Sequence, residues 1–91
     1  MEPDFTELVC DAVAALERGE VVSYGEIAAQ VGRPGAARAV GRILSGSDGT
    51  LPWWRVVTST GRLVPGHETE HAALLEAEGV EVRSGRVVAA S

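Results

Sequence analysis

Apolar residues recur every three or four positions near the start of the chain, with acidic residues between them. This spacing predicts an amphipathic helix over residues 4–18, ended by Gly19. Its apolar face consists of Phe5, Leu8, Val9, Ala12, Val13 and Leu16. Further along, the Ser23-x-x-Glu26 spacing predicts a capping box that starts a second helix, which reaches about Val31.

A turn rich in glycine and proline separates the second predicted helix from a third. Gly32 ends the second helix, residues 33–35 (Arg-Pro-Gly) form the turn, and residues 36–44 are predicted to be helical. Two short helices joined in this way are typical of a helix-turn-helix motif, in which the second helix contacts DNA.

Short β segments and one further helix are predicted in the second half of the chain. Residues 55–58 and 62–64 flank a Ser-Thr-Gly turn at 59–61, which predicts a strand and its return strand. Residues 70–78 are rich in alanine, leucine and glutamate and predict a fourth helix, ended by Gly79.

A terminal β-hairpin is predicted next, with residues 80–82 and 86–88 as strands around Arg-Ser-Gly at 83–85. A helix-turn-helix followed by a small hairpin is the arrangement of a winged-helix domain. We therefore expect a fold that is mainly α with small β-hairpins, a winged-helix-like helix-turn-helix DNA-binding domain. The length of 91 residues predicts that residues 1–91 form a single domain.

The composition narrows the class of protein. Hydrophobic residues make up 45% of the chain, which favours a folded domain over disorder. No apolar run approaches the ~20 residues that a membrane-spanning helix needs. The acidic residues Glu2 and Asp4 stand where a secretory signal would carry basic residues. We expect no contact with a membrane and a cytoplasmic location.

Few residues in the chain can bind a soft metal ion. The single cysteine, Cys10, cannot form an internal disulfide, which fits a reducing cytoplasm, and it lies beside the apolar face of the first helix. Cys10, His67 and His71 do not have the spacing of a zinc site. We interpret both histidines as solvated and expect no metal and no cofactor.

The distribution of charge is more informative than the net charge of −5. Residues 1–32 contain seven acidic residues and one arginine, and residues 63–91 contain five acidic residues and two arginines. Residues 33–62 contain five arginines and one acidic residue. All eight basic residues of the chain are arginine, which binds phosphate with two parallel hydrogen bonds and stacks on bases. The central segment is therefore a candidate DNA contact in an acidic protein.

Residues 51–57 carry the most specific motif of the chain, Leu-Pro-Trp-Trp-Arg-Val-Val. The motif resembles the Pro-Cys-His-Arg-Val active-site motif of the O6-alkylguanine-DNA alkyltransferases, with Trp53 at the alkyl-accepting cysteine. Residues 22–28, 32–41 and 74–80 resemble further segments of the family, in the same order and with similar spacing. The resemblance covers residues 21 to 88. Because Trp53 replaces the cysteine, the chain most resembles the non-catalytic alkyltransferase-like proteins of this family.

The replacement of cysteine at Trp53 removes the chemistry of the family. A thiolate accepts an alkyl group from a base, whereas an indole does not. The resemblance therefore implies a non-enzymatic DNA-damage sensor that binds O6-alkylguanine in duplex DNA by minor-groove binding and nucleotide flipping. It also implies that the protein flags the lesion for nucleotide excision repair proteins. We expect a monomer. A winged-helix regulator that binds a base sequence without lesion preference is the alternative.

The resemblance also implies roles for residues of the helix-turn-helix. Arg38 matches the arginine that fills the space left by the flipped nucleotide, and Tyr24 matches the tyrosine that presses on the 3′ phosphate and reaches the base. A surface arginine that contacts phosphate is the alternative for Arg38. Small residues allow a helix to approach a narrow groove. The expected DNA-binding positions are Tyr24, Ala36, Ala37, Arg38, Gly41 and Arg42.

A lesion pocket is implied around the tryptophan motif. The main-chain carbonyls of Trp53 and Val56 match positions that accept hydrogen bonds from the guanine amino group. We interpret Arg55 of the same motif chiefly as a structural anchor that pairs with loop carbonyls or with a carboxylate such as Glu78. Trp54 stands where the alkyltransferases have histidine, and we interpret it as a packing residue. The expected pocket residues are Tyr24, Trp53, Arg55 and Val56.

Overall fold

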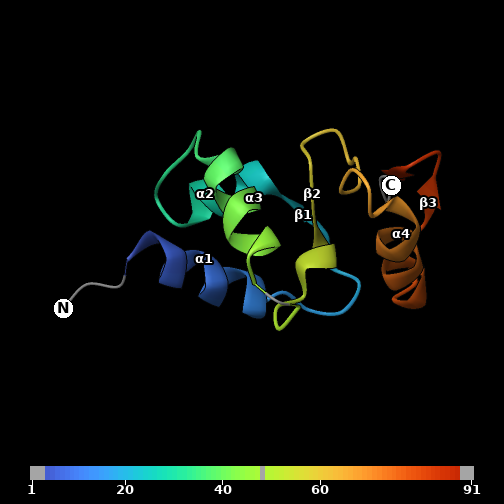
Figure 1. Ribbon diagram of the computed structural model, residues 1–91, viewed down its shortest axis with the longest axis horizontal. Helices are drawn as coiled ribbons and strands as arrows, with labels where there is room; N and C mark the ends of the chain where they lie inside the picture. The colour runs from blue at the N-terminus through green and yellow to red at the C-terminus, as the bar shows by residue number, and fades with distance from the viewer. Residues whose placement is uncertain (1–3, 48, 89–91) are drawn as a thin grey trace.

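The computed structural model describes residues 4–47 and 49–88 of the chain (Figure 1). In this part of the chain the α-helices are α1 (Phe5–Ala14), α2 (Tyr24–Gln30), α3 (Ala37–Ser45) and α4 (Glu68–Ala77). α1 lies along α2 and α3, and α4 lies toward the other end of the molecule, beside the terminal hairpin (Figure 1). The arrangement is the mainly helical, helix-turn-helix fold that the sequence predicts.

α1 begins where the sequence predicts and ends earlier. The side chain of Asp4 accepts the Glu7 N–H at 2.8 Å and caps the first turn. The predicted end near residue 18 is wrong, since α1 ends at Ala14. Beyond it, the Leu16 N–H donates to the Val13 carbonyl, and the Glu17 N–H donates to the Glu20 carboxylate at 2.9 Å. This side-chain hydrogen bond closes a turn in which Gly19 adopts a φ of +83°.

The helix-turn-helix forms where the sequence predicts it. The Ser23 hydroxyl accepts the Glu26 N–H, and the Glu26 carboxylate accepts the Ser23 N–H, both at 3.0 Å. The predicted capping box at the start of α2 is therefore confirmed. α3 begins at Ala37, one residue later than predicted, with no side-chain cap at Ala36. The three N-terminal helices enclose a core whose fully buried members include Val9, Val13, Ile27, Ala28, Val40 and Val56.

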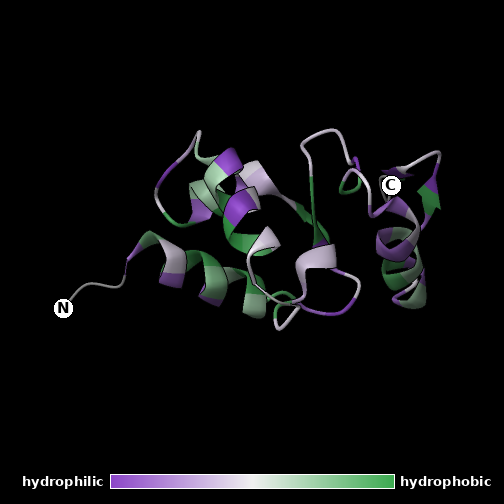
Figure 2. Ribbon diagram, in the orientation of Figure 1, coloured by the Kyte–Doolittle hydropathy of each residue, from purple (hydrophilic) through white to green (hydrophobic). Residues whose placement is uncertain are grey.

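The strand that follows the tryptophan motif pairs with a distant segment. β1 (Val22–Ser23) and β2 (Val56–Val57) are parallel, with Val22 opposite Val56. The predicted hairpin of residues 55–58 with 62–64 is therefore wrong. Both residues of β2 are buried, so this strand belongs between two cores, where a parallel neighbour is favoured over a solvated hairpin. β1 and β2 carry the hydrophobic colour in Figure 2, while α3 and α4 show both colours.

The terminal hairpin is confirmed, with shorter strands than predicted. β3 (Val82–Arg83) and β4 (Arg86–Val87) are antiparallel around Ser84 and Gly85, both with positive φ. This two-residue turn matches the twist of the strands. Arg62 forms an isolated bridge with Arg86, so the predicted return strand joins the terminal hairpin instead. A second core, with Val57, Leu63 and Leu75, lies between this hairpin and α4. No helix within residues 4–47 and 49–88 is long and apolar enough to cross a bilayer.

A candidate nucleic-acid interface and its pocket

α3 presents two arginines on the face opposite its buried residues. Val40 and Leu44 face the core, while Arg38 and Arg42 are exposed one helical turn apart. With Gly41 and Ser45 they line a shallow hollow on the helix surface. Neither arginine forms an ion pair with a residue in the described ranges, so both guanidinium groups are available to bind phosphate oxygens.

Small residues keep the start of α3 narrow and let α2 approach it. Ala36 and Ala37 are half-buried at the first turn of the helix. A Cβ atom at Gly41 would lie 3.9 Å from Cε1 of Tyr24, so the tyrosine ring packs directly on the backbone of α3. The predicted DNA-binding positions of α2 and α3 therefore lie together in the fold.

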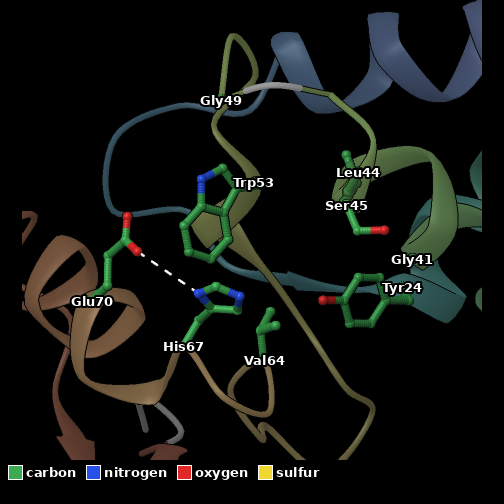
Figure 3. A pocket seen from close by; sticks show the side chains of 9 residues that line it. All are labelled: Tyr24, Gly41, Leu44, Ser45, Gly49, Trp53, Val64, His67 and Glu70. Atoms are coloured by element: carbon green, nitrogen blue, oxygen red, sulfur yellow. Dashed lines mark ion pairs between the residues drawn. The ribbon is translucent and has the colours of Figure 1, made fainter.

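A pocket of about 300 Å³ adjoins the arginine hollow and shares two of its residues, Gly41 and Ser45. Figure 3 shows its walls, which come from the helix-turn-helix on one side and from the segment before α4 on the other. The lining residues are Tyr24, Gly41, Leu44, Ser45, Gly49, Trp53, Val64, His67 and Glu70. The sequence indicated Tyr24 and Trp53 for this role, and the structure places both in one pocket.

Tyr24 is the first residue of α2, and its hydroxyl points toward the pocket (Figure 3). Its side chain is half-buried, and this burial raises the pKa of Tyr24 above its ordinary value of 10.0. The phenol therefore stays neutral near pH 7 and retains an O–H that can donate a hydrogen bond.

Trp53 begins a short 3-10 helix, η1 (Trp53–Arg55), that follows Pro52. Its ring meets the His71 ring edge-on at a centroid distance of 4.9 Å and the Trp54 ring at 6.2 Å. The Trp53 carbonyl accepts the Val56 N–H, which leaves one lone pair for another donor. The indole is therefore held in place by aromatic contacts while one part of it lines the pocket.

Arg55 points away from the pocket, toward the ends of α1 and α4. Its Nε and Nη2 atoms donate to the Glu78 carboxylate over 2.8–3.2 Å, and its Nη1 donates to the Leu16 carbonyl at 2.8 Å. The predicted pairing with Glu78 is confirmed. The Arg55 guanidinium lowers the pKa of Glu78 from 4.5 to about 2. The structure thus gives Arg55 the anchoring role and a place outside the pocket lining.

Trp54 also binds the carboxylate of Glu78. Its Nε1–H donates to Glu78 Oε2 at 2.7 Å, and the Arg55 guanidinium lies 5.5 Å from the centre of its ring. Trp54 also packs against the second core. The interpretation of Trp54 as a packing residue is confirmed. Val56, expected near the pocket, has a side chain with no exposed surface in the first core.

The interpretation of both histidines as solvated is wrong for His71, which has no exposed surface. Its Nδ1 accepts the Val64 N–H at 3.1 Å, and its Nε2 donates to the Trp54 carbonyl at 2.9 Å. Burial lowers the pKa of His71 below 6.5, so the ring is neutral. The spacing to Leu75, four residues on and also buried, was the signal in the sequence. His71 links the tryptophan motif to the segment before α4.

Several pocket residues were not identified from the sequence. Val64, His67 and Glu70 belong to a short segment that matches no family motif residue by residue, so spacing gave no signal for them. His67 is 64% exposed, as is Glu70, and the His67 Nδ1 lies 3.9 Å from Glu70 Oε2. These two side chains make one wall of the pocket polar.

Comparisons with known proteins agree with this geometry. The family model described as 6-O-methylguanine DNA methyltransferase, DNA binding domain, matches residues 4–80. The DNA base-flipping protein of Escherichia coli is 41% identical over 94% of this chain and 70% of its own length. Alkyltransferase-like protein 1 of Schizosaccharomyces pombe is 38% identical over 87% of this chain and 79% of its own length.

A solved structure extends the similarity to the fold. S. pombe Atl1, crystallised with damaged DNA that contains O6-carboxymethylguanine, superposes with a TM-score of 0.80. The match covers 91% of this chain and 83% of that chain at 38% identity. The chain therefore belongs to the family of the 6-O-methylguanine DNA methyltransferase DNA-binding domain, among the relatives that include base-flipping and alkyltransferase-like proteins.

Proposed function

We propose that this protein is a non-enzymatic sensor of O6-alkylguanine in duplex DNA. The proposal rests on Trp53, which lines the same pocket as Tyr24 and which, by the resemblance of its motif, takes the place of the family's alkyl-accepting cysteine. A pocket beside an arginine-bearing helix suits a protein that holds a base outside the duplex. Relatives named base-flipping protein and alkyltransferase-like protein support this function.

α3 enters the minor groove with Arg38 directed at the base stack. Its exposed guanidinium occupies the space vacated by the lesion nucleotide, and Arg42, one turn along, contacts phosphate. Ala36 and Ala37 permit the close approach. The extruded base then enters the pocket between Tyr24 and Trp53. Its volume of about 300 Å³ suits one purine with a small substituent.

Among the described residues that line the pocket there is no cysteine thiol, the group that accepts the alkyl carbon in the family. Cys10, the single cysteine of the chain, lies on α1 and is absent from the residues that line the pocket. Trp53 contacts the O6-alkyl group through dispersion and its π face, without forming a bond. The complex therefore persists until other proteins act, and we propose that it flags the lesion for nucleotide excision repair in the cytoplasm.

The proposal is tested with two duplexes that differ by one O6-methylguanine. We expect at least about tenfold tighter binding of the methylated duplex, since most of the difference comes from the pocket. Equal affinities would instead support the sequence-specific winged-helix regulator. Affinity for unmodified DNA is expected to be moderate and to fall with salt.

The absence of transfer is tested by mass spectrometry after incubation with the methylated duplex. We expect no gain of a methyl group by the protein. Trp53→Cys is expected to remain inefficient in transfer, because Trp54 replaces the histidine that activates the family's thiol. Rapid methylation of the wild-type protein would overturn the non-enzymatic assignment.

A further inference from the structure

The pocket wall formed by α4 and the segment before it carries the ionisable side chains His67 and Glu70, across the pocket from the wall that includes Tyr24 (Figure 3). His67 directly precedes α4, and Glu70 lies in the first turn of that helix. None of the residues that line the pocket in the described part of the chain is an arginine or a lysine. Among the lining residues that the structure describes, Glu70 is the one with a carboxylate.

The orientation of an entering base brings its O6 substituent to this wall. The arginine hollow and the pocket share Gly41 and Ser45, so a nucleotide extruded from DNA on α3 enters from the α3 side. The sugar is attached to the five-membered ring of guanine, and the O6 edge belongs to the six-membered ring. With the sugar near α3, the six-membered ring and its O6 substituent lie deeper in the pocket, on the side of His67 and Glu70.

We propose that Glu70 makes this pocket selective for the charge of the O6 substituent. The pocket accepts neutral substituents and those that carry a positive charge or a hydrogen-bond donor, and it disfavours substituents that end in a carboxylate. The inference rests on the proposed function and names the class of lesion. S. pombe Atl1 was crystallised with DNA that contains O6-carboxymethylguanine, an anionic adduct of the class that this pocket is expected to disfavour.

The size of the effect follows from the exposure of the carboxylate. Glu70 is 64% exposed, so water and salt screen its field, and His67 at 3.9 Å offsets part of it when protonated. A charge pair at about 5 Å in this environment changes binding by about three- to tenfold. Among the described lining residues, no arginine or lysine neutralises an incoming carboxylate.

The test compares two lesions of equal size, O6-carboxymethylguanine and its neutral amide, O6-carbamoylmethylguanine, in one duplex at fixed salt. The wild-type protein is expected to bind the amide about fivefold more tightly, within the range given above. Glu70→Gln is expected to reduce this ratio to about one, and Glu70→Lys to invert it. O6-(2-aminoethyl)guanine, which is cationic, is expected to bind more tightly than the amide to the wild-type protein, about equally to Glu70→Gln and more weakly to Glu70→Lys.

Glu76→Gln is the matched control, since it removes the same charge from an exposed position of α4 outside the pocket. The ratio between the two lesions cancels the effect of net charge on DNA binding. An unchanged ratio in Glu70→Gln, or an equal change in Glu76→Gln, would overturn charge selection by Glu70 while the preference for lesions remains. If the wild-type protein binds neither lesion better than unmodified DNA, the proposed function fails and the inference with it.

Discussion

The half of the molecule built from α1, α2 and α3 packs around aliphatic side chains, whereas the half built from η1, α4 and the terminal hairpin depends on buried polar contacts. In the first half, Val9, Ile27 and Val40 have no exposed surface, and the charged groups face outward. In the second half, Glu78 holds Arg55 and Trp54, and His71 bridges two segments of main chain.

This difference in packing gives the two halves different roles. Because apolar packing alone secures α3, its arginines have no structural partner in the described residues and remain available for DNA. The second half has a smaller aliphatic core, and hydrogen bonds hold Trp54 and His71, whose rings pack edge-on against the Trp53 ring. Substitutions in the polar network should therefore reduce stability, and substitutions on α3 should reduce binding.

The largest expected effect is that of Glu78→Gln on stability. The Arg55 side chain is 16% exposed and that of Glu78 is 8% exposed, so the variant leaves a nearly buried guanidinium without its carboxylate. We expect a loss of about 3 kcal/mol in the free energy of unfolding, near the cost of breaking a buried ion pair. Urea unfolding at pH 7 measures it. Glu76→Gln, an exposed change on the same helix, is expected to cost less than about 0.5 kcal/mol.

The same pair predicts how stability changes in acid. The pKa of Glu78 is about 2 in the folded protein and near 4.5 when the pair is absent. Its contribution is therefore complete above pH 4.5 and is lost as the pH falls toward 2. The difference between wild type and Glu78→Gln should shrink over this interval. A difference that stays constant from pH 5 to pH 2.5 would mean that Glu78 is not ionised in the fold.

The sequence predicted the parts of the fold that depend on local signals. The capping box of Ser23 and Glu26 lies within one turn, and the predicted α3 and α4 begin within two residues of their observed positions. The pairing of β1 with β2 joins segments far apart in the chain, and no local pattern specifies such a partner. α1 ends earlier than its apolar spacing predicts, and the chain beyond it turns with a hydrogen bond from the Glu17 N–H to the Glu20 carboxylate, which periodicity does not reveal.

The sequence predicted those pocket residues that belong to segments resembling the family. Tyr24 and Trp53 belong to segments that resemble the family, and both line the pocket. His67 and Glu70 lie in a compact segment without a motif, and their place depends on where α4 packs. Arg55 shows the opposite case, since it belongs to the motif yet points toward Glu78.

On the helical half, Arg38→Ala is expected to reduce DNA binding without reducing stability. Removing the arginine that we propose enters the base stack should weaken the affinity for an O6-methylguanine duplex about tenfold, and the free energy of unfolding should change by less than about 0.5 kcal/mol. A fluorescent base analogue beside the lesion should also report less extrusion.

Arg62→Ala is the control for Arg38, because it removes the same charge from an exposed position outside the helix-turn-helix. It should lower affinity through the salt-dependent term and leave extrusion unchanged. Equal extrusion by wild type and Arg38→Ala would remove Arg38 from its proposed role and leave it as a phosphate contact.

The smallest expected effect is the pH dependence that His71 confers on the second half. Burial holds the pKa of His71 below its ordinary value of 6.5. Just below pH 6.5 the unfolded chain therefore binds a proton at this ring more readily than the folded protein does. The stability is therefore complete above pH 6.5 and falls as the pH decreases below it, by up to about 1 kcal/mol near pH 5.5.

His71→Gln should abolish this slope while it lowers stability at pH 7 by about 1 kcal/mol, since an amide replaces the hydrogen bonds to Val64 and Trp54 imperfectly. His67→Gln, which changes an exposed histidine one turn earlier, should retain the slope. Urea unfolding of the wild-type protein and both variants between pH 7 and pH 5.5 shows which histidine causes the change of stability with pH. If the slope persists in His71→Gln, the buried ring does not control it, and the polar network of the second half would be less sensitive to pH than its burial indicates.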